Sequence, residues 1–169
     1  MRRGGFISKI RLVFIVLVIF MLGWAANNTY SFFTNLNKEQ PFSFSSNEIK
    51  SPGDWIKETD VKIRNNAVTL LVENATWSTF IDTNSMDPVI DVKSHAIKVV
   101  PKSPSELSIG DIVSYSSEAA KGVVIHRIVE KGIDEQGVFF ITKGDNNKNA
   151  DLQKVRFDQI TGVVVAILY

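Results

Sequence analysis

The chain has 169 residues, of which 44% are hydrophobic and 22% are charged. This apolar content excludes a disordered chain and suffices for one domain with one core. The net charge of +1 gives no basis for a nucleic-acid-binding surface. The absence of cysteine excludes disulfides, a thiolate metal site and a cysteine nucleophile.

The N-terminus carries a membrane-targeting pattern. A basic segment over residues 1–11 precedes an uncharged apolar run from Leu12 to Ala26. A spanning helix needs about 20 such residues, so the run predicts a transmembrane helix over residues 12–30, with Trp24 and Tyr30 suited to the far interface. The basic segment then stays in the cytoplasm and the rest is exported. A cleaved signal peptide fits the same run, which leaves open whether residues 1–26 are retained.

The exported part divides into a polar stretch and a β-rich body. Residues 31–53 are rich in serine and asparagine and show no sustained hydrophobic period, which is typical of a linker or stalk. Residues 54–169 hold short runs of branched and aromatic residues separated by glycine and proline, which favours a mostly antiparallel β barrel or sandwich. These runs cover residues 67–72, 96–100, 111–115, 123–129, 138–142 and 160–168.

Ser85 is the first candidate for chemistry. It follows a predicted strand end and is surrounded by the turn formers Asn84, Asp87 and Pro88. A serine in such a position is well placed to attack a substrate, although most serines in turns only form local hydrogen bonds. The sequence therefore offers Ser85 as a nucleophile that requires a base.

His126 is the candidate base. It lies in the apolar run Val123–Val129, and a neutral imidazole can take the proton of a serine near neutral pH. A histidine in an apolar strand is more often a structural residue. The other histidine, His95, stands in a polar stretch and is predicted to be a solvated loop residue.

Two aspartates follow the run that ends at Thr142. Asp145 and Asp151 stand six residues apart in a segment rich in glycine and asparagine, where carboxylates usually serve turns. Either carboxylate could instead accept the Nδ1 proton of a catalytic histidine. A bound Ca²⁺ is a weaker alternative, because the segment lacks the alternating oxygen ligands and closing glutamate of a calcium loop.

The order of these motifs resembles type I signal peptidases. Ser85-Met-x-Pro, Ile109-Gly-Asp-Ile-Val, His126-Arg-Ile-Val and Lys143-Gly-Asp-Asn-Asn follow one another within residues 79–169. The likeness is to the archaeal and endoplasmic-reticulum branch, in which a histidine replaces the lysine base of most bacterial enzymes.

The resemblance implies a function for each motif. It assigns Ser85 as nucleophile, His126 as base, and Asp145 and Asp151 as the important aspartates, with Asp151 in the triad. The activity implied is serine endopeptidase cleavage of signal peptides from exported preproteins, after small residues and at the membrane lipid surface, without cofactor or metal. The resemblance does not show whether accessory subunits are needed.

The chain also departs from the family pattern. Asn84 stands where glycine or aspartate is common, and asparagine tolerates left-handed backbone better than most residues. Thr83 matches a position at which some members carry a serine hydroxyl that, together with the amide of the nucleophile, stabilises the oxyanion.

Two other readings are open. One is a self-cleaving or differently targeted serine protease with Lys98 or Lys143 as base. The other is a non-catalytic anchored β domain.

Overall fold

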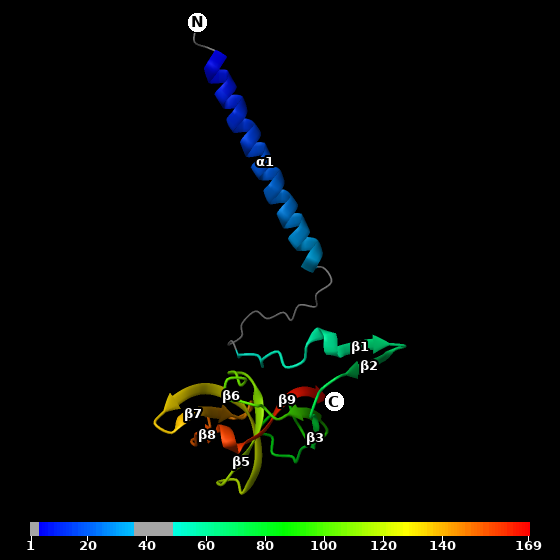
Figure 1. Cartoon of the computed structure of the whole chain (residues 1–169), viewed down its shortest axis with the longest axis vertical. Coiled ribbons are helices and arrows are strands. Elements are labelled where there is room, and N and C mark those ends of the chain that lie inside the picture. Colours follow the sequence, from blue (N-terminus) through cyan, green and yellow to red (C-terminus); the bar gives the residue numbers. More distant parts are fainter. Residues whose placement is uncertain (1–3, 36–48) are drawn as a thin grey trace. The chain divides into compact units, whose positions relative to one another are not determined.

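The computed structural model describes residues 4–35 and 49–169, and the surroundings of side chains for residues 11–30 and 49–169. Contacts divide the chain into two compact units, residues 1–47 and 48–169, each of which is considered by itself (Figure 1). Most of the predicted linker, residues 36–48, lies outside the described part of the chain. The basic pair Arg2 and Arg3 lies outside it as well.

A single long helix, α1 (Gly4–Asn35), makes up the described part of the first unit. Its segment Arg11–Tyr30 is long and apolar enough to cross a membrane, and every side chain in that segment is exposed. A helix that is apolar on all sides is stable when a membrane or a protein core surrounds it. The predicted start of the linker at residue 31 is wrong, because the helix continues to Asn35. Residues 31–35 contain neither glycine nor proline, so nothing in the sequence breaks it there.

The second unit is mostly β and entirely antiparallel, which confirms the predicted β domain behind one N-terminal helix. Seven strands form its main sheet in the order β3-β4-β9-β5-β6-β7-β8. Their bounds are β3 (Thr76–Thr79), β4 (His95–Val99), β5 (Ile112–Ser117), β6 (Gly122–Asp134), β7 (Gly137–Lys143), β8 (Val155–Arg156) and β9 (Ile160–Leu168). The β-branched runs identified in the sequence supply β4, β5, β6, β7 and β9.

Each face of the main sheet carries its own apolar cluster, because neighbouring residues of a strand point to opposite faces. The first cluster contains Val113, Tyr115, Ile128 and Phe140, and the second contains Met86 together with residues such as Ile112, Ala96 and Val164. His126 pairs with Val113 and therefore lies on the face of the first cluster. The next residue, Arg127, points to the face of the second cluster.

A separate hairpin precedes the main sheet. Strands β1 (Val61–Arg64) and β2 (Ala67–Leu70) pair only with each other, and Asn65 and Asn66 form the turn with positive φ angles of 48° and 62° (Figure 1). Asparagine at both central positions suits the two-residue turns that match strand twist.

Several short elements were missed or misassigned. The sequence did not predict β1 or β8, which are four and two residues long. The strand predicted to end near Asp82, before Ser85, is β3, which already ends at Thr79. Two short 3₁₀ helices, Glu58–Asp60 and Phe157–Gln159, were not predicted either.

His95 is not the solvated loop residue that its polar neighbours predicted. It opens β4, where it pairs with Thr79 on one side and Leu168 on the other. Its ring stacks on that of Trp77, with the ring centroids 5.1 Å apart. Contacts with the neighbouring strands therefore determine the conformation of His95 more strongly than its polar neighbours in sequence do.

Candidate active site

His126 and Asp151 form a closely paired base and carboxylate. The Nδ1 atom of His126 lies 2.7 Å from Oδ2 of Asp151, and the two side chains are 10% and 24% exposed. His126 is placed by the central part of β6, and Asp151 by the segment that follows β7. Because an aspartate oxygen can only accept when ionised, the contact sets Nδ1 as the protonated nitrogen and Nε2 as the basic one.

The Nε2 atom of His126 makes no hydrogen bond within the described residues and is not fully buried, although the residue as a whole is only 8% exposed. A ring that is held at one nitrogen and unbonded at the other has the arrangement of a general base.

Asp151 is held by side chains and by its own backbone. Its Oδ2 atom accepts hydrogen bonds from the hydroxyls of Thr142 at 2.6 Å and Tyr115 at 3.1 Å, and its backbone amide donates to the carbonyl of Thr142 at 2.8 Å. Burial, together with the charge of Asp151, raises the pKa of Tyr115 to about 12. The hydroxyl of Tyr115 therefore remains a donor throughout the neutral range.

Ser85 lies in a turn of unusual backbone shape. Asn84, directly before it, has a φ angle of 57°, a left-handed conformation that favours glycine or asparagine. The asparagine at this position thus suits the geometry. The Oγ atom of Ser85 lies 3.2 Å from Oγ1 of Thr83, while Met86 turns inward and is buried in the second cluster.

The loop after β7 is hydrogen-bonded to the turn of Ser85. The backbone amide of Asn146 donates to the carbonyl of Ser85 at 3.0 Å, and its side-chain amide donates to the carbonyl of Asn84 at 2.9 Å. A Cβ atom at Gly144 would stand 2.5 Å from the Ser85 carbonyl oxygen, so only glycine allows this approach. The carbonyls of Asn84 and Ser85 are thereby both fixed to the loop.

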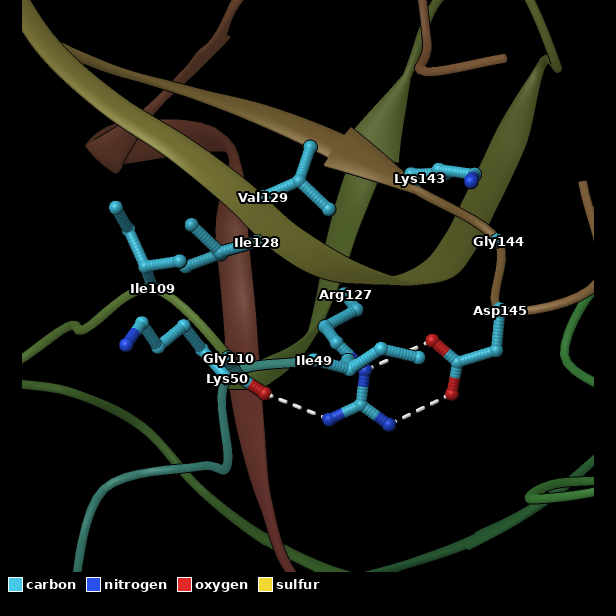
Figure 2. Close-up of a pocket in the computed structure, with 10 residues that line it drawn as sticks. All are labelled: Ile49, Lys50, Ile109, Gly110, Arg127, Ile128, Val129, Lys143, Gly144 and Asp145. Carbon is cyan, nitrogen blue, oxygen red and sulfur yellow. Dashed lines mark hydrogen bonds and ion pairs between the residues drawn. The ribbon is translucent and has the colours of Figure 1, made fainter. Parts of the chain in front are cut away.

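An ion pair fixes the loop itself. The guanidinium of Arg127 donates to both carboxylate oxygens of Asp145, at 2.8 and 2.6 Å, and to the carbonyl of Gly110 at 2.8 Å (Figure 2). The Arg127 and Asp145 side chains are only 11% and 15% exposed. The backbone amide of Asp145 also contacts the sulfur of Met86 at 3.4 Å. Asp145 is therefore a structural clamp between β6 and the turn that carries Ser85.

The same ion pair borders a hollow of about 260 Å³. Its walls are partly apolar, from Ile109, Ile128 and Val129, and partly polar, from Lys143 and Asp145 (Figure 2). Gly144 lies between this hollow and the carbonyl of Ser85.

No hydrogen bond joins the side chains of Ser85 and His126 in the described structure. Pairing of β6 with β7 begins at Arg127 and Lys143, and β7 is followed at once by the loop that binds the carbonyl of Ser85. Catalytic hydrogen bonds are often long in a free enzyme and shorten when substrate binds.

One edge of β6 is unpaired next to the site. Residues 122–127 pair with β5 on one side, whereas pairing with β7 on the other side starts only at Arg127. Within the described residues, the second edge of 122–126 is left without a strand partner. Such an edge offers backbone donors and acceptors to an extended peptide.

Lys98, one of the two alternative bases, forms its hydrogen bond away from Ser85. Lys98 Nζ lies 3.1 Å from Oγ of Ser114, a serine that is 2% exposed, and burial lowers the pKa of Lys98. Asp145 and Asp151 bind different partners, and no group of three potential ligands is found among the described residues.

Sequence reasoning proposed Ser85, His126 and both aspartates as site residues, and it did not point to the residues that hold them. Thr142, Tyr115 and Asn146 lie in strands or loops without a distinctive local pattern. The one signal in the sequence was the alternation of strand residues between the two faces of the sheet. That alternation places Tyr115 and Thr142 on the same face as His126.

The chain matches no family model, no curated protein and no solved structure.

Proposed function

We propose that this chain is a membrane-anchored serine endopeptidase that removes signal peptides from exported preproteins. One observation carries the proposal: His126 is paired with Asp151 at 2.7 Å through one ring nitrogen, and its other nitrogen makes no hydrogen bond within the described residues. The resemblance in motif order supplies the substrate class and the signal-peptidase fold.

The proposed reaction has two steps. Ser85 Oγ attacks the scissile carbonyl while Nε2 of His126 takes the hydroxyl proton, which then passes to the departing amine. Asp151 stabilises the imidazolium that forms in between. In the second step, water loses a proton to His126 and attacks the acyl-enzyme, and the proton returns to Ser85 as the new carboxyl terminus departs.

The charge on the substrate oxygen would be stabilised by the Ser85 turn itself. The backbone amide of Ser85 and the hydroxyl of Thr83 are the proposed oxyanion donors. The Thr83 hydroxyl, 3.2 Å from Oγ of Ser85, is close enough to serve an oxygen that the serine has attacked.

The substrate would bind as an extended strand. The unpaired edge of β6 at residues 122–126 supports this mode, because a peptide added there runs directly past His126. The resemblance supplies the preference for small residues one and three positions before the cut. Anchoring by α1 would raise the effective concentration of precursors whose apolar segments lie in the same bilayer, with the catalytic unit on the extracytoplasmic side.

A lysine base is the rival enzymatic reading. Lys98 donates to the buried Ser114, where no substrate carbonyl can approach, which favours His126. The same measurement that tests the proposal separates the two, since His126→Ala abolishes cleavage only if the histidine is the base.

The test is cleavage of a preprotein by the full chain in detergent micelles. Ser85→Ala is expected to lower the rate by several orders of magnitude while leaving the thermal melt unchanged. Ser105→Ala is the matched control, because Ser105 also has a hydroxyl neighbour, Ser103 Oγ at 2.7 Å, and is exposed. Full activity of Ser85→Ala would refute the assignment. A serine-directed acylating probe that fails to label Ser85 would favour a non-catalytic β domain instead.

A further inference from the structure

Three hydrogen-bond donors converge on one oxygen of Asp151. The imidazole of His126 and the hydroxyls of Thr142 and Tyr115 lie 2.7, 2.6 and 3.1 Å from Oδ2. Thr142 is fully buried and Tyr115 nearly so. A buried hydroxyl that bonds a carboxylate is strongly oriented, because no water is present to replace that partner.

The two hydroxyls come from different strands and lie next to each other. Thr142 lies near the end of β7 and Tyr115 on β5, and their oxygens are 3.2 Å apart. Asp151, in contrast, lies in a segment without helix or strand and has a side chain that is 24% exposed. The carboxylate therefore derives its fixed position from two rigid strands.

From this arrangement we infer that Thr142 and Tyr115 are positioning residues that fix the orientation of Asp151 against His126. Neither hydroxyl reaches the reacting atoms. Each acts through Asp151, which in turn sets the direction in which Nε2 of His126 points. The inference rests on the proposed function only for its kinetic consequence, since the orientation of the pair can be observed without any substrate.

The spectroscopic test uses the full chain in detergent micelles. The Nδ1 proton of His126, bonded to a carboxylate, gives a strongly downfield proton resonance that Asp151→Asn identifies by its loss. In Thr142→Val the resonance is expected to shift upfield or broaden through exchange, and Thr142→Ser, which keeps the hydroxyl, is expected to restore it. An unchanged resonance in Thr142→Val overturns the inference, as does a serine variant that behaves like valine.

The kinetic test uses preprotein cleavage with the same variants. Loss of one hydrogen bond to a charged group predicts a fall in kcat of about 10- to 100-fold in Thr142→Val, with KM nearly unchanged. In Tyr115→Phe, kcat is expected to fall less, because the hydrogen bond from Tyr115 to Oδ2 of Asp151 is longer. Tyr115→Phe also serves as the test variant if Thr142→Val does not fold. Thr161→Val, which removes a hydroxyl bonded only to the carbonyl of Ser114, is the control that keeps full activity.

The two tests separate the inference from the proposed function. A wild-type chain that cleaves no precursor but shows the downfield resonance, and loses it in Thr142→Val, refutes the peptidase and keeps the positioning role. A wild-type chain that cleaves precursors with equal kcat in Thr142→Val and Thr142→Ser keeps the peptidase and refutes the positioning role.

Discussion

The clamp between Arg127 and Asp145 gives the sharpest prediction about stability. Asp145→Ala leaves the guanidinium of Arg127 with the carbonyl of Gly110 as its one remaining partner, in a site where the arginine side chain is 11% exposed. Removing one partner of a nearly buried ion pair costs about 3 kcal/mol, because the other charge remains desolvated. The two hydrogen bonds lost, at 2.8 and 2.6 Å, are both between charged groups, which agrees with that magnitude.

The assay is thermal unfolding of the full chain in detergent, followed by circular dichroism of the β unit. For a unit of about 120 residues, ~3 kcal/mol corresponds to a fall in Tm of roughly 10 °C. The double variant Arg127→Met with Asp145→Ala is expected to recover much of this loss, since it removes the unpaired charge.

An ion pair that is less buried, with an Asp134 side chain that is 26% exposed, provides the matched control. Asp134, which binds Arg156 and Lys154 at the far end of β6, has its pKa lowered by these cations but lies at the surface. Asp134→Asn is therefore expected to lower Tm far less than Asp145→Ala. Equal shifts in the two variants, or a double variant as unstable as Asp145→Ala alone, would refute the argument that burial sets the cost.

Two further predictions concern the site and its surroundings. Asn146→Ala removes the side-chain hydrogen bond to the carbonyl of Asn84 and is expected to lower kcat about tenfold in the cleavage assay. Asn149→Ala, at an exposed position of the same loop, is expected to keep full activity. Equal kcat values in the two variants would contradict a role of Asn146 in holding the turn of Ser85. Because burial lowers the pKa of Lys98, the unfolded chain binds more protons than the folded one just below pH 10.5, and stability rises with pH there. Lys98→Met should therefore flatten the increase in the free energy of unfolding just below pH 10.5 in urea titrations, and an unaltered slope would count against a partly buried amine.

The sequence predicted those parts of the fold in which local pattern and tertiary structure agree. The β-branched runs that became β4, β5, β6, β7 and β9 are long enough for alternation and composition to indicate strands. Strand β3, at Thr76–Thr79, carries no such run and exists because it pairs with β4. His95 was misassigned for the same reason, since its polar neighbours in sequence conceal partners on β3 and β9.

The candidate site could be predicted only as far as its chemically distinctive residues. Serine, histidine and aspartate in a characteristic order are visible in a linear sequence. Which aspartate meets the histidine depends instead on the path of the loop after β7, which returns so that the amide of Asp151 bonds the carbonyl of Thr142. The spacing of the residues in sequence does not reveal the path of this loop. Thr142, whose carbonyl accepts the hydrogen bond, also looks in sequence like any other strand residue.

The six-residue separation of the two aspartates has a geometric reason. His126 and Arg127 are neighbours on β6, so their side chains point to opposite faces of the sheet. Asp145 binds Arg127 on one face, and Asp151 binds His126 on the other. The loop after β7 therefore contributes one carboxylate to each face of the sheet. Between these two aspartates, the backbone amide of Asn146 donates to the carbonyl of Ser85. The loop after β7 therefore holds the turn of Ser85, Arg127 and His126 through three of its own residues, which is the arrangement on which the proposed active site depends.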